Sequence, residues 1–298
     1  MDNFSGDTEI PSKGSASKVV KETSDIDRDN FLSVLNSEHS KLPVSFSIGG
    51  SLQSGFDLLR KETLDSKVEI GGVLFKDVIN EVKVHRISPT ALNSDSLVGF
   101  GFVSISESNI ESTLRMSQYY ANHPEKKEFF KTQVYFVDSS LAQKYRYFFE
   151  KLIQDGKSVI VDGKPLAPVH SHPSGNLPSS GDFDHVVSPS GDGKLIPEVV
   201  LTEDWVYFLF PTRQTPDFSI GTFGEFKMKD PYEGIRNEEG EDRAAKHLLA
   251  TSGKDSSEEH RNKALNAVRL KVITDKCLKY NVGFYTLAKG ESVAKRIA

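Results

Sequence analysis

The stretch PLAPVHSHPSGNLPSSGD, residues 165–182, joins three kinds of local structure within a few residues. Residues 165–169 are mostly apolar and predict a strand that ends at two histidines. Proline and glycine in residues 173–178 predict a turn directly after the second histidine. Ser179 then provides a signal for the start of a helix. The chain therefore bends back on itself next to His170 and His172, and the surrounding fold has to accommodate that bend.

His170 and His172 are spaced as a pair of metal ligands. In a strand, residues two apart project to the same face, so the two imidazoles lie side by side. Neutral imidazole nitrogen binds zinc at about 2.0–2.1 Å. The simpler interpretation is two partly exposed histidines at the end of a strand, and this spacing alone does not exclude it.

Ser179 and Asp182 extend the pattern. Residues three apart in the first turn of a helix face the same way, so Asp182 is a candidate third ligand and Ser179 a candidate hydroxyl donor. The alternative is a capping box that satisfies only backbone N–H groups. Three protein ligands leave a fourth tetrahedral position for water, which is typical of a catalytic zinc. Catalysis also needs a carboxylate that does not bind the metal, and spacing alone does not select one.

These residues resemble the JAMM motif of MPN+ (JAB) domains, in which His-x-His is followed by Ser-x-x-Asp. The glutamate of that family lies upstream in a Glu-x-Gly-Gly-x-Leu pattern, which residues 69–74 match as EIGGVL. The resemblance implies that Glu69 is the general acid/base and that Ser179 stabilises the oxyanion. It also implies that one catalytic Zn²⁺ is held by His170, His172 and Asp182.

The match departs from the family in one spacing. Six residues separate His172 from Ser179, whereas the family usually has seven. A seven-residue gap would place Phe183 at the position of the acid, and phenylalanine cannot bind zinc. Moving the acid to Asp184 would place Gly181 where the serine belongs. Only Ser179 with Asp182 supplies both groups, so the loop is expected to be one residue shorter than usual.

The resemblance covers about residues 44–225 and is nearest to prokaryotic-type JAB domains. It implies an α/β (α+β) fold in which a mixed sheet is flanked by helices, with the MPN/JAB (cytidine-deaminase-like) architecture. We expect a disordered tail over residues 1–28, the catalytic domain over residues 29–228, and a charged, partly helical C-terminal extension over residues 229–298. The sequence predicts strands over 44–48, 68–75, 81–87, 98–105, 132–137, 157–161, 165–169, 198–202, 205–211 and 218–228. It predicts helices over 30–39, 53–64, 108–122, 141–154 and 256–278, and one that begins at Ser179.

Composition limits the functional classes. The formal net charge of −5 and the absence of a basic stripe give no support for nucleic-acid binding. Cys277 is the single cysteine, so an internal disulfide and a cysteine-rich zinc site are both excluded. No secretory signal and no apolar run of about 20 residues is visible, which predicts a cytoplasmic protein without a membrane span.

The resemblance implies a zinc-dependent isopeptidase or peptidase that hydrolyses an amide bond after the C-terminus of ubiquitin or a ubiquitin-like protein. An extended tail lying along a strand edge is a reasonable mode of binding for such a substrate. Three alternatives stay open: a JAB hydrolase acting on a sulfur-carrier conjugate or a small peptide, a non-catalytic MPN scaffold, and a DNA-associated role like that suggested for RadC-like proteins. Residues 229–298 are a candidate docking segment for a partner.

Overall fold

The fold is taken from a computed structural model, which describes thirteen parts of the chain. These are residues 34, 37–77, 79, 81–87, 101–113, 115, 119, 123, 133–153, 158–173, 177–187, 195–216 and 258–298. The expected tail over residues 1–28 and the expected strand over residues 218–228 lie outside them, as does most of the expected helix over residues 30–39.

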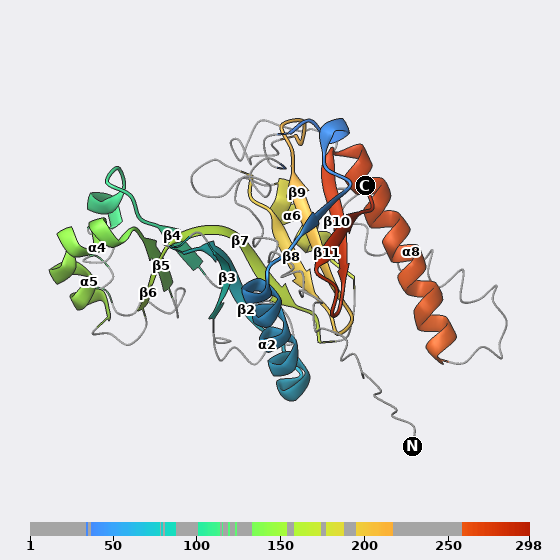
Figure 1. Cartoon of the computed structure of the whole chain (residues 1–298), viewed down its shortest axis with the longest axis horizontal. Coiled ribbons are helices and arrows are strands. Elements are labelled where there is room, and N and C mark those ends of the chain that lie inside the picture. Colours follow the sequence, from blue (N-terminus) through green and yellow to red (C-terminus); the bar gives the residue numbers. More distant parts are fainter. Residues whose placement is uncertain are drawn as a thin grey trace, which may run out of the picture.

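A curled sheet of eight strands forms the larger part of the molecule (Figure 1). In spatial order it contains β1 (Ser45–Ser47), β11 (Val293–Arg296), β10 (Val282–Ala288), β9 (Trp205–Pro211), β8 (Glu198–Leu201), β7 (Lys164–Ser171), β2 (Gly71–Lys76) and β3 (Val82–Ile87). Neighbouring strands are antiparallel except for β7 and β8, which are parallel. The sheet is therefore mixed, as the sequence predicted.

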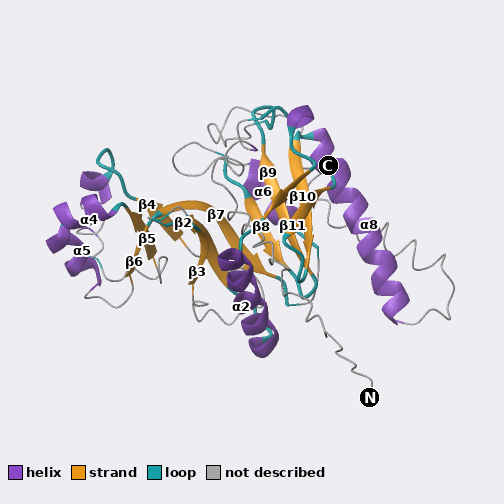
Figure 2. Ribbon diagram, viewed as in Figure 1, coloured by secondary structure: helices purple, strands orange, loops and turns teal. Residues whose placement is uncertain are grey.

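Helices cover both faces of this sheet (Figure 2). Helix α2 (Gly50–Ser66) packs on one face through Leu52, Phe56 and Leu59, which are fully buried against strand residues such as Phe208. On the other face lie α6 (Ser180–Val187) and α8 (Glu258–Lys279), which form a second apolar cluster with the sheet. Because the central strands are covered on both faces, their sequences are continuous hydrophobic runs and do not alternate between apolar and polar residues.

A smaller parallel sheet follows β3 in the chain. It contains β4 (Gly101–Ser104), β5 (Gln133–Val137) and β6 (Ser158–Asp162), with α4 (Ser139–Lys144) and α5 (Arg146–Ile153) beside it (Figure 1). The single helix expected over residues 141–154 is two helices, because the chain leaves the helical conformation at Tyr145. Phe136 and Val134 of β5 pack against Val73 and Phe75 of β2 and join the two sheets.

The C-terminal residues complete the large sheet, and this corrects the expected domain boundary at residue 228. Strand β10 pairs with β9 along its whole length, and β11 bridges β10 to β1. The described part of the expected extension, residues 258–298, is therefore part of the same fold as the candidate site. Across the ranges that the structure describes, no helix combines the length and the apolar character that crossing a membrane requires.

We predict that Phe284→Ala destabilises the whole fold. Phe284 lies in β10 and is fully buried between the sheet and the helices of the second cluster. Removal of a buried phenylalanine ring should lower the free energy of unfolding by about 3–5 kcal/mol. Urea denaturation followed by far-UV circular dichroism measures this change. Leu278→Ala is the control, because Leu278 is 53% exposed and its loss should cost no more than about 0.5 kcal/mol. Equal effects of the two substitutions would contradict the placement of β10 in the core.

Candidate metal centre

Strand β7 directs its last residues alternately to the two faces of the sheet. His170 is paired with Val200 of β8, and Val200 belongs to the cluster beneath α6 and α8. His172 follows the strand and donates its backbone N–H to the carbonyl of Leu201. Because residues two apart share a face, both imidazoles lie on the α6 side of the sheet.

Ser171 points to the opposite face and fixes the end of β7. Its hydroxyl oxygen accepts the backbone N–H of Ile70 at 2.9 Å and lies 2.5 Å from the hydroxyl oxygen of Thr63 in α2. Its backbone N–H also donates to the carbonyl of Ile70. The small polar residue between the two histidines therefore ties β7 to the entry of β2 and to α2, and this sets the direction of both imidazoles.

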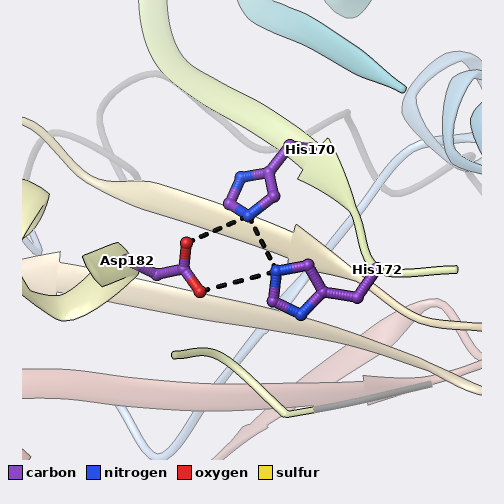
Figure 3. A group of neighbouring side chains, drawn as sticks. All are labelled: His170, His172 and Asp182. Atoms are coloured by element: carbon purple, nitrogen blue, oxygen red, sulfur yellow. Dashed lines mark hydrogen bonds and ion pairs between the residues drawn. The ribbon is translucent and has the colours of Figure 1, made fainter. Parts of the chain in front are cut away.

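Three side chains converge on one point (Figure 3). The Nε2 atoms of His170 and His172 are 3.1 Å apart, and the two Asp182 oxygens lie 3.0 Å from His170 Nε2 and 3.6 Å from His172 Nε2. Two atoms that each bind a tetrahedral zinc at about 2.05 Å are about 3.3 Å apart. The nitrogen–nitrogen separation is close to this value, and one ligand atom from each of the three residues lies within 4.8 Å of the others, so the three side chains could hold a metal ion.

The capping box is also present, so Asp182 caps α6 as well as facing the two histidines. Its carboxylate accepts the backbone N–H of Ser179 at 2.5 Å, and the Ser179 hydroxyl accepts the backbone N–H of Asp182 at 3.3 Å. These bonds start α6 and hold the Asp182 carboxylate toward the histidines. Ser179 itself is exposed and immediately precedes the first residue of the helix. The two interpretations of Ser-x-x-Asp are thus compatible.

Glu198 is a part of the site that the sequence did not reveal. It is the first residue of β8, it is only 2% exposed, and its Oε1 lies 3.0 Å from His170 Nδ1. Its Oε2 lies 3.7 Å from Nδ1 of His185, which is on α6. The one available signal was a carboxylate that opens the apolar run EVVL. His185 therefore lies at the edge of this group.

The charges of the centre favour a cation. Asp182 and Glu198 are two buried carboxylates, and each such group requires a compensating positive charge or a full set of hydrogen bonds. Burial lowers the pKa of His170, but the adjoining Asp182 and Glu198 outweigh it and raise that pKa to about 10. Burial raises the pKa of Asp182, and the two histidines outweigh it and lower that pKa to about 2. A divalent ion supplies the same compensation to the two carboxylates while both imidazoles are neutral.

Glu69 lies between α2 and β2, just before the strand in which it was expected. Helix α2 ends with Lys67 in the left-handed conformation, and β2 begins at Gly71. Gly71 pairs with His170, so continuing the register places Glu69 opposite His172 on the same face. Among the described residues, the group that could hold a metal contains His170, His172 and Asp182 and does not include Glu69. Glu69 is half-buried and remains a carboxylate outside the ligand set.

The glycine pair after Glu69 has a packing reason. A Cβ added at Gly72 would lie 2.8 Å from the carbonyl oxygen of His85 on β3 and 3.3 Å from Val169 on β7. No larger residue fits between β3 and β7 at that position without a shift of the backbone. The glycine therefore lets β2 lie closely between its two neighbours and brings the entry of β2 to the end of β7.

Comparison of the chain with protein-family models, with curated proteins and with solved structures finds no match in any of the three.

We predict that the metal-free protein loses stability as the pH rises above neutrality. The pKa of His170 is raised from 6.5 to about 10, so its contribution is fully present below pH 6.5 and is lost as the pH rises through about 10. The pKa of Asp182 is lowered from 3.8 to about 2, so its contribution is present above pH 3.8 and is lost as the pH falls through about 2. Urea denaturation of chelator-treated protein across this range measures both effects.

Asp182→Asn serves as the comparison for this pH dependence. Without the Asp182 charge the pKa of His170 should be less raised, and the decline in stability above neutral pH should be smaller. A native metal-free protein whose stability is constant between about pH 6.5 and about pH 10 would contradict the ion pair.

Proposed function

We propose that this chain is a zinc-dependent amide hydrolase of the JAMM type, with the MPN/JAB architecture. The observation that carries the proposal is the convergence of three side chains: His170 Nε2 and His172 Nε2 are 3.1 Å apart, one Asp182 oxygen lies 3.0 Å from His170 Nε2, and the other lies 3.6 Å from His172 Nε2. All three arrive from fixed elements, two from the end of β7 and one from the first turn of α6. The match of residues 69–74 to the family's glutamate pattern adds the carboxylate that hydrolysis needs.

The ligand set suits zinc in its chemistry as well as its spacing. Two imidazole nitrogens and one carboxylate oxygen are a common three-ligand set for catalytic zinc, and they leave one position open. When bound, the ion supplies Lewis-acid polarisation and lowers the pKa of water to about 7. His170, His172 and Asp182 would hold it, and none of the three is then available as a proton carrier.

Glu69 is the residue that we assign to proton transfer. It stands outside the ligand set, it follows the end of α2, and its register places it on the face that carries both histidines. In the proposed reaction Glu69 accepts a proton from the attacking water and returns it to the nitrogen of the departing amine. A carboxylate can do this only if it does not bind the metal through the same oxygen.

Ser179 is assigned to the developing oxyanion. Its hydroxyl oxygen accepts the backbone N–H of Asp182 at the start of α6. In the proposed reaction the proton of Ser179 is donated to an acceptor next to the metal centre. Donation to an amide oxygen that gains negative charge is a recognised source of catalysis.

The proposed substrate is an amide bond at the C-terminus of ubiquitin or a ubiquitin-like protein. This substrate class comes from the resemblance of the motif alone. We choose it over a scaffold role because His170, His172 and Asp182 converge and because Ser179 and Glu69 stand at the remaining positions of the motif, and a scaffold requires none of these side chains.

The first experiment determines the metal. Purified native chain should contain about one zinc per chain by mass spectrometry of the metal, since three ligands and an open position bind a single ion. His172→Ala should lose most of this zinc, because it removes one of the three ligands. His123→Ala is the control, because His123 contacts the carbonyl of Tyr119 outside the site. A native chain without zinc after purification and after incubation with zinc would contradict the proposal.

The second experiment separates metal binding from catalysis. Glu69→Gln should keep its zinc and should hydrolyse ubiquitin C-terminally linked to a fluorogenic amine about 10²–10⁴-fold more slowly. Glu81→Gln is the matched control, because Glu81 is a partly exposed carboxylate at the far end of the β2–β3 pair. Native turnover by Glu69→Gln would show that the general base is assigned to the wrong residue. A zinc-loaded native chain that leaves this amide intact would contradict the substrate class.

A further inference from the structure

Glu198 contacts a proposed zinc ligand on the side away from the ion. His170 presents Nε2 to His172 and Asp182, and the opposite ring nitrogen, Nδ1, lies 3.0 Å from Glu198 Oε1. The Glu198 side chain is 3% exposed, so water does not compete for this contact. The imidazole is therefore held at both nitrogens by buried groups.

The contact determines which nitrogen of His170 carries the proton. An ionised carboxylate only accepts hydrogen bonds, so His170 Nδ1 must be the donor. A neutral imidazole that is protonated at Nδ1 has its lone pair at Nε2. Nε2 is the atom that lies 3.1 Å from His172 Nε2, where the proposed ion binds. Glu198 thus selects the tautomer that can coordinate zinc.

The buried carboxylate of Glu198 requires a hydrogen-bond donor such as His170 Nδ1–H. Val199, Val200 and Leu201, which follow it in β8, are all fully buried. A carboxylate at the start of such a strand is costly unless it is paired. The other candidate partner, His185, lies 3.7 Å away and its side chain is 57% exposed. The shorter and more buried contact is the one to His170.

Helix α6 arranges both sides of this imidazole. Asp182 and His185 are three residues apart on α6 and therefore face the same way. Asp182 contacts Nε2 of His170, while His185 contacts the second oxygen of Glu198. The first turns of α6 and the start of β8 together set the plane of the His170 ring.

We propose that Glu198 is a positioning residue of the metal centre, which holds His170 Nδ1–H and presents His170 Nε2 to the zinc ion. This inference rests on the proposed zinc site and adds to it a residue outside the ligand set. Carboxylates that accept the second N–H of a metal-binding histidine typically contribute about 10–100-fold to metal affinity.

Zinc affinity measured by competition with a chelating dye tests this role. Glu198→Gln should bind zinc about 10–100-fold more weakly than the native chain. Glu203→Gln is the matched control, because Glu203 is an exposed carboxylate in the turn between β8 and β9 and carries the same charge. The control should bind zinc within about threefold of the native chain, since exposed charges have small effects.

A second readout needs no variant and does not depend on folding of Glu198→Gln. Nitrogen NMR of the zinc-loaded native chain with labelled histidine should show His170 protonated at Nδ1 and bound to zinc through Nε2. Zinc bound through Nδ1 of His170, or native affinity in folded Glu198→Gln, would overturn the inference alone. A native chain that binds no zinc would overturn both this inference and the proposed function.

Discussion

The imidazole of His170 lies between two buried carboxylates, with Asp182 at its Nε2 and Glu198 at its Nδ1. The two acids come from different elements, α6 and β8, and each has to be brought to the ring by the packing of the sheet. Burying two negative charges beside one ring is stable only if positive charge is present between them. A proton on His170 supplies positive charge in the metal-free protein, and a divalent cation with neutral imidazoles would supply it in the metal-bound protein.

This constraint explains why the end of β7 is so closely fixed. Ser171 accepts the backbone N–H of Ile70 and contacts Thr63 of α2. These contacts fix the orientation of the backbone between His170 and His172. The capping box of Ser179 fixes the first turn of α6 and with it the direction of the Asp182 carboxylate. Each candidate ligand is therefore oriented by contacts within the protein itself, which is the condition for a preorganised site.

The sequence predicted the local parts of this arrangement and missed those that depend on distant pairing. His170, His172 and Asp182 were found because a strand, a turn and a helix start lie within one short segment. Glu198 was missed because its contact with His170 arises from the parallel pairing of β7 and β8, which no short segment encodes. The central position of β10 was missed for the same reason. Strand β10 pairs with β9, which lies about seventy residues earlier in the chain, and local sequence patterns do not indicate which distant segments pair. Glu69 was expected inside a strand, whereas β2 begins two residues later, at Gly71, because the end of a strand depends on the strands it pairs with.

The measurement that most directly tests the metal centre is X-ray diffraction from zinc-loaded crystals at wavelengths on either side of the zinc absorption edge. We expect one anomalous peak per chain, about 2.0–2.2 Å from Nε2 of His170, Nε2 of His172 and one oxygen of Asp182. Such a peak, with Glu198 still bonded to His170 Nδ1, would establish the centre as it is described above. A zinc-loaded crystal with no peak among these three residues, or with the ion held by other side chains, would contradict it.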